Sequence, residues 1–141
     1  MKKHNLSSLK TISMAGERCD NKTMEWLQRN FLGVFINDTY WQTESGLFIC
    51  SNYKNYYQLP FKMGSCTKPC PGFVVHILDD NGEIVGPEVS GRVCIKLPLP
   101  PGFAPTLWKN DNGFFEKYLS PCPGKFCFDF QNMMHRILPN W

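Results

Sequence analysis

Residues 9–36 read LKTISMAGERCDNKTMEWLQRNFLGVFI, and this segment determines the class of fold that the chain adopts. A short apolar strand, Leu9 to Met14, ends at Ala15-Gly16-Glu17, and a second apolar run follows at Val34-Phe35-Ile36. The second run has no polar face and is typical of a strand buried on both sides. Because a helical pattern separates the two, we predict a parallel pair of strands joined by a right-handed crossover.

The connecting segment carries the signals of a helix. Asp20 or Asn21 can cap its first turn, because a short side-chain oxygen accepts from the free backbone amides there. Gly33 supplies a left-handed stop at the other end. Apolar residues recur at helical spacing between these signals, and they predict one stripe packed on the sheet: Met24, Leu27 and Phe31.

The middle of the chain is antiparallel β in character. Residues 51–70 are rich in Tyr, Asn, Lys and Pro, which favours an ordered loop. A strand over 73–79 follows, and Asp80-Asn81-Gly82 is a strong hairpin turn from which residues 83–85 start the return. A further strand over 91–97 stops at a proline-rich segment.

The domain plan follows from these segments. We predict an α/β fold: a strand-helix-strand unit with a parallel pair of strands, followed by an antiparallel β section. Residues 125–141 sustain no helical or strand period and form a divergent tail. The apolar side chains of that tail need a surface to bury against, so we expect exposed apolar surface to favour self-association.

Composition narrows the class of protein. Hydrophobic residues make up 43% and charged residues 19%, which is enough apolar material for a packed core. The net charge of +3 comes from scattered lysines and not from a basic stripe, so nucleic acid is not an expected partner. No apolar run reaches the roughly 20 residues that span a bilayer, and no apolar segment of a secretory signal follows the first lysines.

Seven cysteines suggest a metal site or a thiol-rich interior. Cys66 and Cys70 are spaced C-x3-C, and Cys122 and Cys127 are spaced C-x4-C. Neither matches the C-x2-C spacing of zinc sites, and no histidine lies near enough in sequence to complete four ligands. We therefore expect reduced, mostly buried thiols in an intracellular compartment.

Residues 38–46, DTYWQTESG, hold the densest set of chemically useful side chains, and they directly follow the second predicted strand. Ligands bind at the carboxyl ends of parallel strands in open α/β sheets. Hydroxyls can donate to phosphate, a carboxylate can hold Mg²⁺, and aromatic rings can bound an apolar pocket. From chemistry alone, two interpretations stay open: a site for phosphate, magnesium and a small ligand, or a polar loop with structural aromatics.

This stretch resembles the D-T-[WY]-W-Q-T-E-[TS]-G signature of the acetyl- and propionyl-CoA synthetases, which belong to the adenylate-forming ligase superfamily. The resemblance covers roughly Leu6 to Gly124, and the segment up to Leu107 is closer to the propionate branch. It implies that residues 1–124 are an incomplete AMP-binding domain, in which the strand-helix-strand piece belongs to a doubly wound sheet and the antiparallel β section is barrel-like. It also implies a mitochondrial or cytoplasmic location. The flanking matches are Ser8–Thr11, Ala15–Asp20, Pro71–Phe73, Ile77–Asp80, Lys96–Gly102 and Leu107–Asn110.

The resemblance implies a reaction and its substrates. Such AMP-forming enzymes join a small carboxylate, acetate or propionate, to ATP in the presence of Mg²⁺, release pyrophosphate, and pass the acyl group to CoA. A tryptophan in the acyl pocket leaves room for two or three carbons, because an apolar pocket discriminates by about 1–3 kcal/mol per methylene. Tyr40 and Trp41 are the acyl-pocket residues that the resemblance implies.

The resemblance also implies the nucleotide site, residue by residue. Gly16, Glu17 and Arg18 would lie along the adenine, with Arg18 at a place where the acetate branch often has proline. Asp38 and Thr39 would face the adenine from the next strand. Three residues would act at the phosphates: Gln42 orienting the nucleotide, Thr43 donating to the α-phosphate, and Glu44 holding Mg²⁺.

Other parts of the family pattern do not occur in these residues. They are the glycine-rich phosphate loop, the T-G-D motif expected after Pro123-Gly124, and the C-terminal domain with its lysine. We therefore expect a truncated fragment that does not catalyse the reaction alone. The alternatives are a non-catalytic module that binds adenylates or a partner chain, and a small β protein in which the motif is incidental. His76 and Cys19 are expected to be structural.

Overall fold

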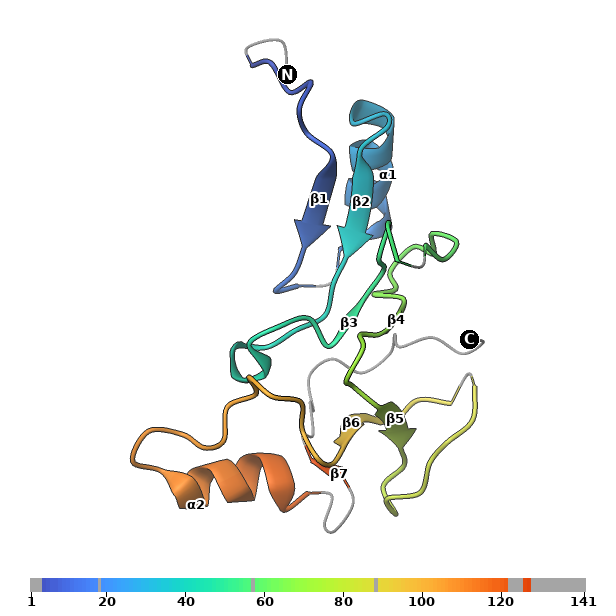
Figure 1. Cartoon of the computed structure of the whole chain (residues 1–141). Helices are drawn as coiled ribbons and strands as arrows, with labels where there is room; N and C mark the ends of the chain where they lie inside the picture. The colour runs from blue at the N-terminus through green and yellow to red at the C-terminus, as the bar shows by residue number, and fades with distance from the viewer. Residues whose placement is uncertain (1–3, 18, 57, 88, 122–125, 128–141) are drawn as a thin grey trace.

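The computed structural model describes residues 4–17, 19–56, 58–87, 89–121 and 126–127. The molecule is elongated, with a strand-helix-strand unit at one end and an antiparallel sheet at the other (Figure 1). In the first unit, β1 (Thr11–Met14) and β2 (Phe35–Asp38) pair in parallel, with Thr11 opposite Phe35 and Met14 opposite Asp38. The predicted parallel pair is confirmed.

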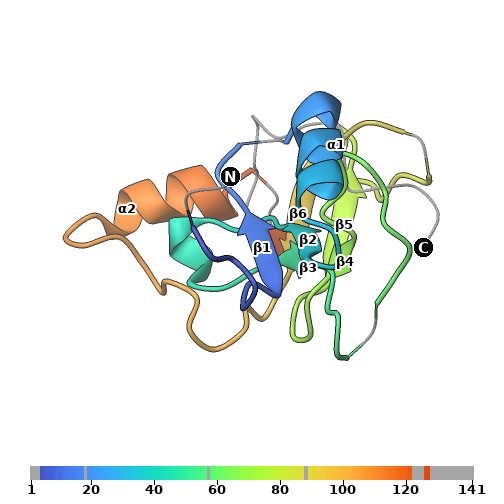
Figure 2. The ribbon, with the colours of Figure 1, turned by 90° about the horizontal axis from the view of Figure 1, so that it is seen from above.

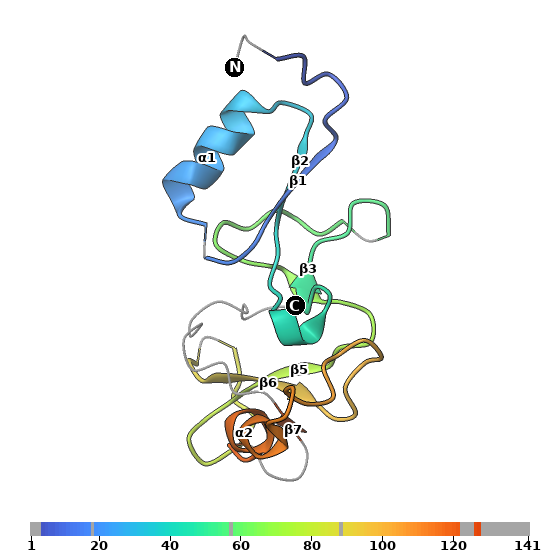
Figure 3. The same ribbon diagram turned by 90° about the vertical axis from the view of Figure 1, so that its left-hand side faces the viewer.

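Helix α1 (Asn21–Asn30) connects these strands and lies beside them (Figure 3). Asp20 is its N-cap, since the carboxylate accepts from the Thr23 amide at 3.0 Å and from the Thr23 hydroxyl at 2.6 Å. Met24 is fully buried, whereas the other members of the predicted stripe, Leu27 and Phe31, are half-buried. The helix ends at Asn30 with Phe31, at φ −121° and ψ 60°, as its C-cap, so Gly33 is not the left-handed stop that was predicted. Gly33 has a φ of 78° in the turn that follows, where the Val34 amide donates to the Phe31 carbonyl at 3.1 Å.

The segment predicted as a loop is closed at its two ends by a short ladder. β3 (Cys50–Ser51) pairs antiparallel with β4 (Lys68–Pro69), and the Cys70 amide donates to the Ile49 carbonyl at 2.8 Å. Lysine and proline are poor strand formers, so local propensity gave no indication of this pairing. It arises from tertiary contact, because Cys50 and Cys70 are both buried in the core.

The antiparallel section is an open sheet in the order β5-β6-β7. β5 (Val75–Leu78) and β6 (Arg92–Lys96) confirm the two predicted strands. Between them the Asp79 carboxylate accepts from the amides of Asn81 and Glu83, which shapes the predicted turn. The predicted return strand is reduced to one bridge, Leu78 with Ile84. Within the described residues, this sheet does not close into a barrel.

Two features were not predicted. A helix, α2 (Asp111–Phe114), continues into a π-helical turn, η2 (Phe115–Leu119), and Asn110 caps it by accepting from the Gly113 amide. β7 (Phe126–Cys127) adds a third strand beside β6, although no strand was predicted in the tail. The rest of the tail, and the boundary between residues 124 and 125, lie outside the described residues. The division into two segments therefore stays a prediction.

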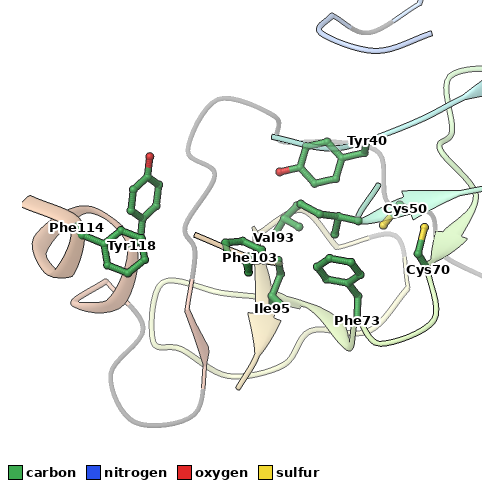
Figure 4. Close-up of a cluster of buried hydrophobic side chains, with 10 residues drawn as sticks. Tyr40, Cys50, Cys70, Phe73, Val93, Ile95, Phe103, Phe114 and Tyr118 are labelled. Carbon is green, nitrogen blue, oxygen red and sulfur yellow. The ribbon is translucent and has the colours of Figure 1, made fainter. Parts of the chain in front are cut away.

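The main core contains side chains of the antiparallel sheet and of the segments that pack on it (Figure 4). In this core, β5 and β6 pack against the segment around β3 and against α2 with its π-helical continuation. Seen from above, α2 lies to one side of the strands (Figure 2). The buried members of the core are Tyr40, Ile49, Cys50, Cys70, Phe73, Val93, Ile95, Phe103, Phe114 and Tyr118. Tyr40 anchors the loop of residues 38–46, which we call the signature loop, in this core. In the described part of the chain, no helix is both long and apolar enough to cross a membrane.

Candidate functional site

The signature loop begins where β1 and β2 end together. The Thr39 amide and hydroxyl both donate to the Met14 carbonyl, at 3.0 and 2.7 Å, which ties the start of the loop to the end of β1. Gly16 follows β1 with a φ of 96°, a conformation open to glycine at little strain. The parallel register thus brings two exposed residues, Gly16 and Glu17, to the same sheet edge as Asp38 and Thr39.

Cys19 and Asp38 also approach each other at this edge. Burial raises the pKa of the Cys19 thiol, and the negative charges of Asp38 and Asp20 raise it further. A thiol in such surroundings carries little thiolate and is a poor nucleophile, which agrees with the structural role expected for it. Arg18, the third residue predicted along the adenine, lies outside the described residues.

The two predicted acyl-pocket residues have different surroundings. Tyr40 is buried, forms a β-bridge with Cys50, and accepts from the Gln42 side-chain amide at 3.5 Å. Burial raises the pKa of the Tyr40 hydroxyl well above its usual range. Trp41 is 41% exposed and packs edge-on against Phe48, with ring centroids 6.4 Å apart. Tyr40 thus sits in the core, whereas Trp41 offers a ring at the surface.

A single tight turn contains the three residues that were predicted to act at the phosphates, Gln42, Thr43 and Glu44. Thr43–Ser45 form a 3-10 turn, η1, in which the Ser45 hydroxyl accepts from the Gln42 amide at 3.0 Å and the Ser45 amide donates to the Gln42 carbonyl at 3.0 Å. Gly46 ends the turn with a φ of 65°. Thr43 is exposed and Gln42 half-buried, so the turn presents a hydroxyl and a carboxamide beside each other.

Glu44 is held from two directions. Its carbonyl accepts from the Ala104 amide at 2.7 Å, and its Oε1 accepts from the Tyr118 hydroxyl at 2.5 Å. Tyr118 is 3% exposed, and burial raises its pKa to about 12, with the hydrogen bond and charge of Glu44 adding to the shift. The tyrosine therefore stays a donor at neutral pH.

Sequence reasoning missed Tyr118. It lies 74 residues from Glu44, and no spacing or motif connects the two positions. The sequence indicated only that Tyr118 stands among apolar residues, a pattern that suits a position in the core.

Glu44 is suited to bind a cation that is also coordinated by the phosphates of a ligand. Among the described residues, no group of three or more His, Cys, Asp or Glu side chains could hold a metal ion. Mg²⁺ usually takes one or two carboxylates and completes its shell with water and substrate phosphates, so it does not need such a group. A half-buried carboxylate with one oxygen engaged by Tyr118 fits that mode.

The candidate site thus has two sides, and the signature loop contributes residues to both. One side is the strand edge, with Gly16, Glu17, Asp38 and Thr39, and the other is the η1 turn, with Gln42, Thr43 and Glu44. The first offers backbone groups and a carboxylate, and the second offers a hydroxyl, an amide and a carboxylate. This is a donor and acceptor set suited to a polar ligand that carries phosphate.

Comparison with known proteins identifies the family of the chain. The sequence profile of the AMP-binding enzyme family matches residues 1–104. The chain is 41% identical over 122 residues to acyl-CoA synthetase short-chain family member B, mitochondrial, of Dictyostelium discoideum, covering 86% of this chain and 17% of that protein. It is 40% identical over 128 residues to acyl-CoA synthetase short-chain family member 3, mitochondrial, of Homo sapiens, covering 89% and 18%.

A bacterial relative extends the similarity. Propionate–CoA ligase of Escherichia coli is 38% identical over 121 residues, which cover 85% of this chain and 19% of the ligase. The chain thus spans under a fifth of the length of these three relatives. With most of its length matched by the family profile, the chain belongs to the AMP-binding enzyme family, in which it is similar to the short-chain acyl-CoA synthetases.

Proposed function

We propose that this chain carries the adenylate-binding loops of a short-chain acyl-CoA synthetase, and that these 141 residues alone do not complete the reaction. The observation that carries the proposal is the common edge of β1 and β2, where the Thr39 hydroxyl and amide bind the Met14 carbonyl. That edge brings the two predicted adenine segments together in a protein of the AMP-binding family.

On the adenine side, Asp38 would accept from the exocyclic amino group of the base. Gly16 and Glu17 would pass along the ring, since glycine allows a close backbone approach. Thr39 is buried and already engaged with Met14, so it would shape the wall without contacting the base through its hydroxyl. Arg18 would complete the wall.

On the phosphate side, Thr43 would donate to the α-phosphate and Gln42 would orient the nucleotide. Glu44 would hold Mg²⁺, which, when bound, offsets negative charge on the phosphates. The exposure of Thr43 supports its role. The polar groups of this chain orient the α-phosphate, and the departing pyrophosphate would need donors beyond those in the signature loop.

For the acyl group, Trp41 would bound the pocket and Tyr40 would support it from the core. The substrate class is a carboxylate of two or three carbons, acetate or propionate, with ATP and CoA as co-substrates. The Escherichia coli relative is named propionate–CoA ligase, which supports propionate as the substrate. Two relatives are named mitochondrial, and we propose mitochondria or cytoplasm as the location.

The experiment is pyrophosphate release by the purified 141-residue chain with ATP and Mg²⁺, with and without acetate or propionate. We expect no release above the blank, because the chain spans under a fifth of its relatives. Carboxylate-dependent release that falls in Glu44→Ala would show that the chain is a complete catalyst and would contradict the proposal.

A second candidate is a non-catalytic module that binds adenylates or a partner chain. The exposed fractions of Trp108, at 88%, and Leu32, at 85%, favour a surface that another polypeptide covers. Equilibrium dialysis with AMP separates the two forms of this module, since only the adenylate-binding form retains the nucleotide.

A further inference from the structure

Tyr118 reaches the candidate metal carboxylate from a distant part of the chain. Its hydroxyl donates to Glu44 Oε1, and its ring packs on Phe114 with centroids 5.2 Å apart. The ring is buried, so the hydroxyl has little freedom to leave its acceptor. The contact therefore joins the π-helical turn to the signature loop at a single defined atom.

The backbone places Tyr118 in an unusual way. Residues 115–119 form a π-helical turn, and the Ser120 amide donates to the Phe115 carbonyl at 2.8 Å, five residues back. Such turns cost stability, are rare, and occur often at functional sites because they shift one side chain around the helix. Here the shifted turn contains the tyrosine that contacts Glu44.

The backbone of Glu44 is fixed as well. Its carbonyl accepts from Ala104, and a Cβ added at Gly46 would lie 2.8 Å from the Gly102 carbonyl oxygen. The segment 102–104 therefore packs directly against the η1 turn. With the main chain held by one segment and Oε1 by another, the described residues leave Glu44 little choice of side-chain orientation.

From this geometry we infer that Tyr118 is a positioning residue, which holds the Glu44 carboxylate in the orientation that receives the Mg²⁺ of a bound nucleotide. The inference rests on the proposed function, since it needs Glu44 to be a ligand. It goes further by assigning a role to a residue that no motif includes. Partners that orient a ligand typically change metal affinity by about 10–100-fold when they are removed.

The first test asks whether the contact exists in solution, without any ligand. Urea-unfolding midpoints are compared for the native chain, Tyr118→Phe, Glu44→Ala and the double variant. We expect each single change to lower the midpoint and the double change to lower it by no more than the larger single effect. Additive effects of the two changes would overturn the inference.

The second test reads metal affinity directly. Because ATP itself binds Mn²⁺, binding of the Mn²⁺–ATP complex to the chain is followed by the enhancement of the water proton relaxation rate over that of Mn²⁺ and ATP without protein. We expect Tyr118→Phe to weaken Mn²⁺ binding about tenfold and to leave ATP binding without metal unchanged. Glu44→Gln, which keeps an acceptor for Tyr118 but loses the charge, should weaken Mn²⁺ binding at least as much.

The outcomes separate the inference from the proposed function. If Glu44→Gln weakens Mn²⁺ binding and Tyr118→Phe does not, the positioning role is wrong and the proposed function stands. If neither variant differs from a native chain that binds Mn²⁺ with ATP, Glu44 is not the ligand and the inference falls. If the native chain binds no Mn²⁺ with ATP, the metal role in the proposed function fails, and the inference fails with it.

Discussion

Gly46 shows how single residues fix the signature loop. It ends the η1 turn with a φ of 65°, and an added Cβ would lie 2.8 Å from the Gly102 carbonyl oxygen. Two requirements therefore coincide at one position: a left-handed backbone and close approach of a second segment. Gly33 has a φ of 78° but nothing within 4 Å of an added Cβ, so it meets only the first requirement.

We predict that Gly46→Ala destabilises the chain more than Gly33→Ala does. The left-handed penalty is about 1–2 kcal/mol for both, and forced displacement of the 102–104 segment adds about 1–3 kcal/mol at Gly46. Urea unfolding measures both variants against the native chain. Equal losses would mean that the 102–104 segment does not press on the loop as described.

The buried thiols give a second prediction at the residue scale. The hydrogen bond with Cys66, followed by burial, raises the pKa of the Cys50 thiol, and burial raises that of Cys70. Because the thiolate is the reacting form, iodoacetamide at pH 8 should alkylate both at least about tenfold more slowly in the folded chain than in urea. Peptide mass spectrometry measures each site. Folded and unfolded rates that agree at Cys50 would contradict its burial.

At the scale of elements, the sequence was informative where local pattern and tertiary structure agree. The cap at Asp20, the parallel strand at β2 and the turn at Asp80-Asn81-Gly82 were all predicted and all occur in the structure. The apolar run 34–36 was expected to be buried on both sides, but only Ile36 of the run is buried. β3–β4 and β7 were missed because they are two-residue ladders, made by packing and not by propensity. Helix α2 was missed because its segment carries Gly113 and several aromatics in place of a clear apolar stripe.

Helix α1 gives the prediction at this scale. Met24 is the one residue of the predicted stripe that is fully buried, so Met24→Ala should destabilise the chain by about 2–5 kcal/mol. Leu32→Ala, just beyond the helix at a position 85% exposed, is the control and should change stability by less than about 0.5 kcal/mol. Chemical unfolding followed by circular dichroism compares them. A small effect at Met24 would mean that α1 does not pack on the sheet.

At the scale of the whole molecule, the candidate site depends on contacts between segments far apart in sequence. The residues of the signature loop could be named from their motif, and the parallel register explains why Gly16 and Asp38 share one edge. Tyr118 and the approach of Gly102 could not be predicted, since both depend on how the antiparallel sheet and α2 fold back on the loop. The sequence pattern thus named the candidate site residues, and packing between distant segments determines how the structure holds them.

The core thiols should make the free energy of unfolding decrease at alkaline pH. Folding raises the pKa of Cys50 and Cys70, so the folded state favours the protonated thiols more than the unfolded chain does. Their contribution is fully present below about pH 8.5, the ordinary thiol value, and is lost as pH rises above it. We predict a lower urea midpoint at pH 10 than at pH 7, with a reducing agent present. A urea midpoint that stays constant or rises from pH 7 to pH 10 would contradict the predicted direction of this effect.

The most direct test of the central claim is an AMP titration of the ¹⁵N-labelled 141-residue chain, followed by its backbone amide resonances. If the adenylate binds at the common edge of β1 and β2, we expect chemical-shift changes concentrated at Gly16, Glu17, Asp38 and Thr39. We expect these shift changes to be lost in Asp38→Ala. Unshifted resonances at that edge, or shifts confined to β5, β6 and α2, would contradict it, because the adenylate would then bind elsewhere or not at all.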